Sequence, residues 1–446
     1  MLSLFIFAQR KLRDYKRQCE ECRFMVYYKN EEESIKIQNS KKMNQNSKLN
    51  IFKVIFTLLF VCSSMMTVHA QTLTGDKFGK GLRMMAADSS FAVKFSVRMQ
   101  NRFEGYYVED GNPSYKEQIY LRRARFKFDG FVLTPKLKYK IEYDAVNAEM
   151  LDAVVKWNFA GNWNLWAGQT KLPGNRERVI SSQKLQFVDR SLLNSKFTID
   201  RDKGIQLRHH FNVGDVLVRN IGSIAAGEGK NFKKEDHDMD IIGDRQGRSY
   251  TYRLEVLPFG KFTSKGDYVG GDLKRESDPK LALGLSFDYN DNAIKSNGQK
   301  GDIMYNSRDL QTVFADMMFK CHGFSWMFEY VNRSVASDSA MLYELDGDGE
   351  YVLDEGARIE RGSFYTGTSI NNSFGYLFKN NWEVAARYTE VRPEGITGNP
   401  ELTEYTLGVS KYVVGHNLKV QSDFSLREEN GKDDKFIFRL QLEVAL

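Results

Sequence analysis

The sequence contains few cysteines and few prolines, and each shortage excludes a class of structure. It has 446 residues but only 4 cysteines, of which Cys321 alone lies beyond position 62. No disulfide framework is therefore expected in the main part of the chain. The sequence has only 7 prolines but 35 glycines, 22 tyrosines and 31 phenylalanines. This composition favours many strands joined by tight turns over a helical protein.

The sequence also lacks a long apolar run. The run Val54–Cys62 (VIFTLLFVC) is too short to span a bilayer as a helix. Lys53 directly precedes this run, and a cleavage site of small residues ends at Ala70. Both features fit a secretory signal peptide, which we expect at residues 43–70. Residues 1–42 lie upstream of that signal and are interpreted as a false start of translation. A genuine cytoplasmic extension is the alternative.

The net charge of +6 does not describe the whole chain. The first 70 residues hold 12 of the 64 Lys and Arg residues and 6 of the 58 Asp and Glu residues, so 52 of each remain in the rest. The remainder is near neutral, and no nucleic-acid partner is expected. Near-neutrality also argues against a strongly anion-selective pore. No Ser/His/acid spacing, phosphate-binding Gly loop or metal motif is present, so we expect neither an enzyme nor a cofactor.

Side chains alternate along the stretch Ile119–Tyr143, which predicts two strands around a turn at Leu133-Thr134-Pro135. One face of the first strand is expected to carry Arg122, Ala124, Phe126 and Phe128. The opposite face is expected to carry Leu121, Arg123, Arg125, Lys127 and Asp129. In the second strand the apolar face holds Leu137, Tyr139, Ile141 and Tyr143. The charged face holds Lys136, Lys138, Lys140, Glu142 and Asp144.

Such a sheet either covers a soluble core or separates lipid from a water-filled lumen, and the rest of the chain favours the lumen. The alternation that begins at Phe91 runs longer than the strands of soluble domains. About 16 strands follow, with short turns alternating with long polar loops. The last, Phe436–Leu446, must pair with the first to leave no edge in lipid. We therefore predict an all-β fold, a transmembrane antiparallel β-barrel at residues 91–446, with residues 71–90 as a short periplasmic segment.

Three stretches carry a family resemblance: LRRARF (Leu121–Phe126), Lys171–Leu193 and PKLALGLSFDYN (Pro279–Asn290). They resemble the phosphate-selective porin O/P family, in a form found in Bacteroidetes-type bacteria. The resemblance implies a trimeric 16-stranded barrel in the outer membrane of a Gram-negative cell. It also implies a third loop folded into the lumen and selectivity for small anions, phosphate above all, through a ladder and a central cluster of Lys and Arg.

The stretch Lys171–Lys203 follows the fifth predicted strand, which makes it the third external loop. It is both basic and unusually apolar, as expected of a loop that folds into the barrel. Fixed cations in a narrow lumen would lower the entry cost of an anion, and Arg suits oxyanions through its planar fork. Candidate constriction residues are Lys171, Arg176, Arg178, Lys184 and Arg190. Candidate lumen residues are Arg98, Arg102, Arg123, Arg125, Lys127, Lys138 and Lys140.

Several alternatives remain open at this point. The strand cations can pair with Glu142 and Asp144 on the next strand instead of attracting anions. The barrel can be a general diffusion porin with a charge-separated constriction. It can also be a non-conducting barrel that binds partners through the loops at Ser223–Ser249 and Asn332–Arg361. An outer-membrane lipase or protease is a third class, but the sequence offers no clear Ser or Asp beside a His.

Overall fold

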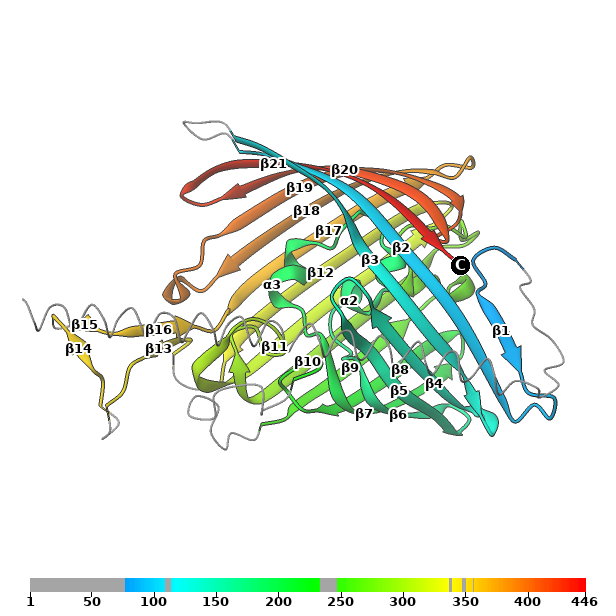
Figure 1. Ribbon diagram of the computed structural model, residues 1–446, viewed down its shortest axis with the longest axis horizontal. Helices are drawn as coiled ribbons and strands as arrows, with labels where there is room; N and C mark the ends of the chain where they lie inside the picture. Colours follow the sequence, from blue (N-terminus) through cyan, green and yellow to red (C-terminus); the bar gives the residue numbers. More distant parts are fainter. Residues whose placement is uncertain (1–76, 109–113, 233–246, 337–338, 347–349, 356) are drawn as a thin grey trace, which may run out of the picture. The chain divides into compact units, whose positions relative to one another are not determined.

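A computed structural model describes residues 77–108, 114–232, 247–336, 339–346, 350–355 and 357–446. Its main sheet is antiparallel and closes into a barrel of sixteen long strands (Figure 1). The strands are β2 Phe91–Val108, β3 Ser114–Val132, β4 Thr134–Asp144, β5 Glu149–Ala160, β6 Trp163–Lys171, β7 Arg201–Val213, β8 Val216–Ala225, β9 Ser249–Leu257, β10 Lys280–Lys295, β11 Ile303–Cys321, β12 Phe324–Val335, β17 Gly367–Leu377, β18 Trp382–Pro393, β19 Leu402–Val414, β20 Leu418–Glu429 and β21 Lys432–Ala445. The predicted number of strands is confirmed.

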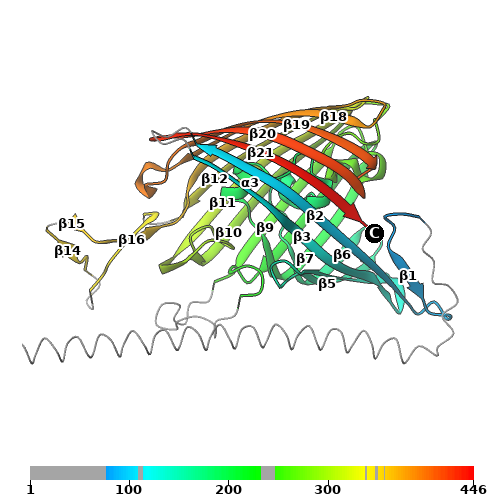
Figure 2. The same ribbon diagram turned by 45° about the horizontal axis from the view of Figure 1, so that its top comes forward.

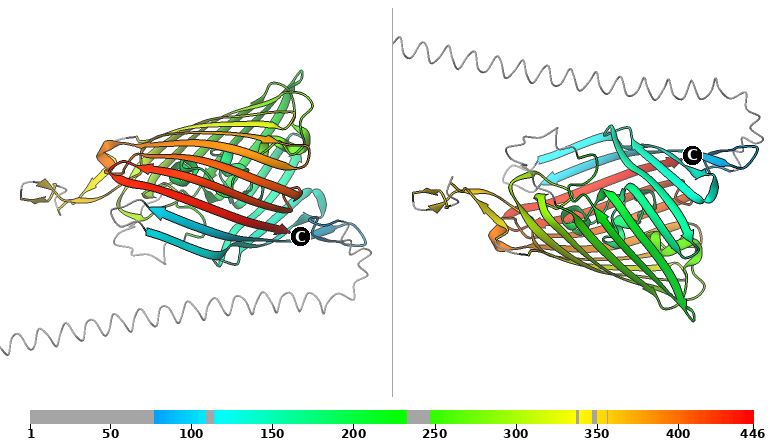
Figure 3. Two further views of the ribbon diagram at one scale, coloured as in Figure 1. Left: turned by 90° about the horizontal axis from the view of Figure 1, so that it is seen from above. Right: turned by 90° about the horizontal axis from the view of Figure 1, so that it is seen from below.

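The barrel closes between its last and first strands. β21 pairs with β2 from Ala445 opposite Arg98 to Lys435 opposite Val108. The short strand β1 (Leu82–Met85) continues along the same edge of β2, beyond the end of β21 (Figure 3). Closure matters because an unpaired strand edge would leave backbone N–H and C=O groups unsatisfied in lipid.

The two faces of the wall differ as the alternation predicts. On β21 the outward side chains Phe438, Leu440 and Leu442 are exposed, whereas Arg439, Gln441 and Glu443 point inward and are buried. The same pattern recurs along the other long strands, for example at the exposed Leu283, Leu285 and Phe287 of β10. The outer surface is therefore apolar and the inner surface polar, the reverse of a soluble barrel.

The predicted faces of Leu121 and Arg122 are wrong. β2 residue Gln100 pairs with Arg123 and the next residue, Asn101, pairs with Leu121, so Arg122 is an extra residue in β3. This β-bulge reverses the alternation between the two ends of the strand. Leu121 is 40% exposed on the outer face, and Arg122 lines the lumen. The predicted faces on the turn side of the bulge, from Arg123 to Asp129, fit the register.

Most connections are short at one end of the barrel, the turn end, and longer at the other, the loop end. Each end has exceptions. The turns between β3 and β4, β5 and β6, β7 and β8, and β11 and β12 are tight. The connection 258–279, at the turn end, is long and contains η3 (Thr263–Tyr268). At the loop end, the connections 145–148 and 430–431 are short. None of the helices in the described part of the chain is long and apolar enough to cross a lipid bilayer.

The connection between β12 and β17 carries additional strands. β13 (Met341–Tyr343) pairs with β16 (Glu360–Ser363), and β14 (Leu353–Asp354) pairs with β15 (Ala357–Arg358). They lie beyond the loop ends of the barrel strands (Figure 2). Residues 364–366 separate β16, which ends at Ser363, from β17, which begins at Gly367. The short helix η4 (Gly395–Thr397) lies between β18 and β19.

The predictions for the N-terminal region stay predictions. Residues 1–42, the signal peptide at 43–70 and residues 71–76 lie outside the described residues. The described part of the predicted periplasmic segment begins at residue 77 and includes β1, which pairs with β2.

Candidate functional site

The connection between β6 and β7, residues 172–200, lies inside the barrel and is called the inner loop here (Figure 1). It contains α2 (Arg176–Val179), η1 (Ser182–Lys184) and α3 (Leu192–Phe197). Its apolar side chains Leu193 and Phe197 are fully buried in a cluster with Phe314, Val331 and Val391 of the barrel wall. Apolar residues at this position explain why the loop packs against β12, β17 and β18 rather than extending into solvent.

Three of the predicted cations hold the inner loop in place. Arg102 of β2 reaches Asp189 at 2.8 Å and the Val188 carbonyl at 3.0 Å. Arg98 donates to the Ser182 hydroxyl at 2.8 Å. Neither side chain is among the described residues that line the two large cavities of the lumen. These residues therefore act as anchors between wall and loop.

Arg176, predicted at the constriction, is the third anchor. Its side chain is fully buried, with Nε 2.7 Å from Asp316 and a guanidinium nitrogen 3.7 Å from Glu255. It also donates to the Asp267 carbonyl at 3.2 Å. Asp316 in turn accepts from Arg253 at 2.7 Å. A network of two arginines and two carboxylates fixes the start of the inner loop to β9 and β11.

Two large cavities lie beside the inner loop among the described residues of the lumen. The main cavity, of about 1000 Å³, lies along β3 to β9. The outer cavity, of about 630 Å³, lies between α3 and the loop ends of β2, β20 and β21. The acids of the main cavity are Glu142, Asp144, Glu149, Asp152 and Asp200. Its cations are Arg122, Arg123, Arg125, Lys140, Lys156, Lys171, Arg178, Lys184, Arg190, Arg201, Arg208, Arg219, Lys230, Arg253, Lys261, Lys265 and Lys300.

The residues that line both cavities are all cationic. They come from the β3 bulge, the inner loop and the connection 296–302, and we call them the junction: Arg122, Arg123, Arg178, Arg190 and Lys300. Sequence reasoning placed Arg123, Arg178 and Arg190 among the candidates. It assigned Arg122 to the outer face and did not single out Lys300, which lies in a short connection with no periodic pattern.

Several cations of the main cavity are paired with acids. This agrees with the alternative hypothesis that strand cations pair with Glu142 and Asp144 on the next strand. Arg125 lies 3.1 Å from Glu142 and 3.2 Å from Asp144. Lys140 lies 2.6 Å from Glu142 and 2.7 Å from Asp152. These carboxylates neutralise part of the charge on the β3–β5 wall.

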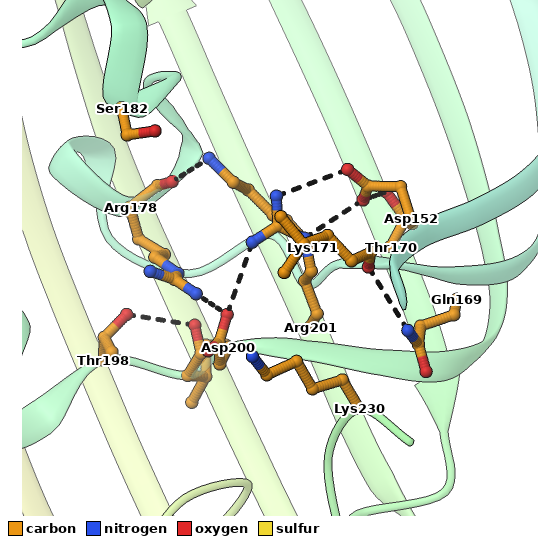
Figure 4. Close-up of polar contacts among 12 residues, drawn as sticks. Asp152, Gln169, Thr170, Lys171, Arg178, Ser182, Thr198, Asp200, Arg201 and Lys230 are labelled. Carbon is orange, nitrogen blue, oxygen red and sulfur yellow. Dashed lines mark hydrogen bonds and ion pairs between the residues drawn. The ribbon is translucent and has the colours of Figure 1, made fainter. Parts of the chain in front are cut away.

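Other cations are held by neutral groups. Lys171, the last residue of β6, donates to the carbonyls of Arg178 at 2.6 Å and Ile180 at 3.0 Å. Arg190 donates to the carbonyls of Ile180 at 2.9 Å and Glu177 at 3.1 Å. Figure 4 shows Lys171 against the Arg178 backbone, while the Arg178 guanidinium forms an ion pair with Asp200. Carbonyl partners orient a cation without cancelling its charge.

Three remaining candidates lie toward the turn end. Lys127 pairs with Asp129 at 2.8 Å, and Lys138 is exposed opposite Lys156. Neither Lys127 nor Lys138 lines the two cavities. Lys184 of the inner loop does line the main cavity. Sequence reasoning did not single out three further cations that line the main cavity, Lys156, Arg208 and Arg219, although each alternates with outward apolar residues on its strand.

The connection 258–279 lines the turn side of the main cavity. Gly270 N–H donates to the Lys184 carbonyl at 2.8 Å, which joins the connection to the inner loop. Lys320 of β11 donates to the carbonyls of Gly266 and Val269 at 2.9 Å and of Gly271 at 2.8 Å. Lys261 and Lys265, which project from this connection, line the cavity. The lumen is thus narrowed from both ends.

The electrostatic environment alters the ionisation of groups at the junction. Burial opposes ionisation of Asp189, but Arg102, Arg123 and Arg122 outweigh it and hold its pKa well below the usual range. Burial lowers the pKa of Arg190 to about 10, so it stays charged at neutral pH. Burial, with Arg178 and Lys230 nearby, lowers the pKa of Lys300 to about 8. Lys300 therefore loses its charge as the pH rises through about 8.

A closed barrel with an apolar outer surface, a charged lumen and an inward-folded loop defines an outer-membrane channel of the porin type. Comparison with known proteins identifies the family. Residues 93–443 match the family described as phosphate-selective porin O and P. The chain belongs to this family, and it is an outer-membrane porin.

Individual relatives are distant. An uncharacterized protein of Aquifex aeolicus (strain VF5) is 21% identical over 387 residues, which cover 77% of this chain and 84% of the relative. Among solved structures, an anion-selective porin from Comamonas acidovorans is 10% identical with a TM-score of 0.48, covering 80% of this chain and 100% of that one. The outer membrane channel DcaP of Acinetobacter baumannii is also 10% identical, with a TM-score of 0.48, covering 80% and 98%.

Proposed function

We propose that this porin conducts small anions, with phosphate as the preferred one, through the junction between its two cavities. The observation that carries the proposal is that, among the residues the structure describes, every one that lines both cavities is a Lys or Arg. An ion that moves from the outer cavity to the main cavity meets these side chains. The family to which the chain belongs is described as phosphate-selective, which supports phosphate as the anion.

The mechanism is electrostatic. An anion that loses part of its hydration at the junction regains favourable interactions with fixed cations, while a cation meets repulsion. Guanidinium groups present paired N–H donors that match two oxygens of a phosphate, so Arg122, Arg123 and Arg178 suit an oxyanion better than chloride. The cations continue into the main cavity, which offers successive weak sites instead of one deep site where the ion would be trapped.

A general diffusion porin is the second candidate, and the ion pairs favour it in part. Asp189 lies 3.7 Å from both Arg122 and Arg123, and Asp200 pairs with Arg178. These acids reduce the field at the junction. Arg190 and Lys300 have no carboxylate within ion-pair distance among the described residues, so a net cationic field remains.

Planar-bilayer recording of the purified protein tests the proposal. In a KCl gradient the reversal potential should show preference for chloride over potassium. Phosphate added to chloride solutions should reduce the chloride current in a saturable manner, because it occupies the same sites more strongly. A reversal potential near zero would favour general diffusion, and the absence of any current would favour a non-conducting surface-binding barrel.

Assembly and processing are also proposals. The family resemblance supports a homotrimer, whose mass in detergent can be measured by light scattering combined with size-exclusion chromatography. We also propose that the signal peptide is removed after Ala70. Mass spectrometry of the mature protein from outer membranes should then find Gln71 at its N-terminus, and a different first residue would contradict the cleavage site.

A further inference from the structure

Two cations in the main cavity are held by an aromatic ring. Lys156 of β5 and Arg208 of β7 both contact Trp166 of β6. The Lys156 ammonium lies 3.9 Å from the centroid of the Trp166 ring, and the Arg208 guanidinium carbon lies 3.8 Å from it. All three side chains line the main cavity. At these distances both contacts are cation–π interactions.

The strand order explains the geometry. β6 lies between β5 and β7, and Lys156 is the register partner of Trp166. Trp166 pairs on the other side with Gln206, two residues from Arg208. A ring that projects inward from the central strand of the three lies within reach of a cation from each neighbouring strand. Gln206 fixes the guanidinium further, accepting from Arg208 at 3.1 and 2.7 Å.

The partners of these two cations are electrically neutral. No carboxylate lies within ion-pair distance of Lys156 or Arg208 among the described residues, whereas Lys140 on the neighbouring strand contacts both Glu142 and Asp152. An aromatic face attracts a cation through its quadrupole and leaves the net charge unchanged. A carboxylate in the same position would cancel one charge. Trp166 therefore positions two like charges without neutralising either.

These residues lie on the turn side of the wall, so an anion entering from the outer cavity reaches them after the junction. Lys156 and Arg208 lie nearer the turn ends than the loop ends of β5 and β7. We propose that Trp166 is a positioning residue that holds Lys156 and Arg208 as an oxyanion-binding step in the main cavity. The inference rests on the proposed anion conduction and identifies the uncharged residue on which this step depends.

The test uses substitutions that do not change the charge of the pore. Trp166→Leu removes the ring faces and Trp166→Phe keeps an aromatic ring. Trp326→Leu is the matched control, because Trp326 lies on β12 and stacks on Phe374 rather than lining either cavity. Each purified variant is studied in planar bilayers, with inorganic phosphate titrated against chloride current.

We expect Trp166→Leu to weaken phosphate block at least fivefold, Trp166→Phe to restore most of it, and Trp326→Leu to match the wild type within twofold. Trp166→Gln, which suits a water-filled lumen, replaces the Leu variant if that protein does not fold. Phosphate block within twofold of the wild type in the non-aromatic variant would overturn the role of Trp166. A wild-type channel without chloride preference or phosphate block would instead overturn the proposed function itself.

Discussion

The proposed anion binding at the junction predicts that replacing Asp189 with Asn raises the affinity for phosphate. The low pKa of Asp189 means that it is ionised at neutral pH, so Asp189→Asn removes a full negative charge. The guanidinium groups of Arg122 and Arg123 each lie 3.7 Å from this carboxylate. The Asn side-chain oxygen can still accept from Arg102, which preserves the contact between the inner loop and β2.

The size of the effect follows from Coulomb's law. An anion bound on the far side of Arg122 or Arg123 would lie roughly 7 Å from Asp189, where the repulsion is about 0.6 kcal/mol at the dielectric constant of water and about 2.4 kcal/mol at an effective value near 20. Removing this repulsion should raise phosphate affinity roughly 3- to 50-fold. The gain should shrink at high ionic strength because salt screens exposed charges.

The assay is phosphate block of chloride current in planar bilayers, measured at low and high KCl. Asp129→Asn is the control, because Asp129 pairs with Lys127 at 2.8 Å but lines neither cavity. It should shift phosphate affinity less than twofold. If Asp189→Asn weakens phosphate block, or leaves it unchanged in a protein with wild-type thermal stability, the assigned position of the anion at the junction is wrong.

Three further predictions concern the anchors and the pH response. Arg176→Met leaves Asp316 and Glu255 with one fewer cation, so the variant should lose about 3–5 kcal/mol of stability by denaturant unfolding, and unchanged stability would contradict the anchoring role. Lys320→Met removes three bonds to the connection 258–279, and we expect a larger single-channel conductance; an unchanged conductance would show that this connection does not narrow the pore. Because the pKa of Lys300 is about 8, its charge is present below that pH and lost above it. Chloride preference should therefore fall between pH 7 and 9, and Lys300→Met should flatten this profile.

The barrel could be predicted from the sequence because its wall repeats one simple pattern. Most lipid-facing positions are apolar and most lumen-facing positions are polar, so alternation along strands such as Phe436–Leu446 carries enough information to locate them. Prediction failed where a single residue broke the period. The bulge at Arg122 adds one residue to β3, and nothing in the local sequence distinguishes it from a regular strand.

The candidate site could be predicted only in part, because the roles of its cations depend on contacts between distant segments. Arg176 and Arg190 lie in the same basic loop, yet Arg176 is buried against Asp316 while Arg190 lines both cavities. Their separation in sequence does not indicate which one faces the path. Lys300 and Trp166 gave no signal at all, since one lies in a short connection and the other resembles ordinary strand packing.

The chain beyond residue 70 is near neutral, yet the lining of its lumen is rich in cations. Both can hold because some cations are paired with carboxylates and others with neutral groups. The anchor Arg176 pairs with carboxylates behind the inner loop, where a charge without a partner would be costly. At the path, Arg190 is held by backbone carbonyls and Arg208 by an amide and an aromatic ring. Carboxylates thus partner the anchor and some of the lining cations, whereas Arg190 and Arg208 face the lumen with neutral partners that leave their charge intact. The sum of charges in the sequence therefore underestimates the field that an anion meets inside the lumen.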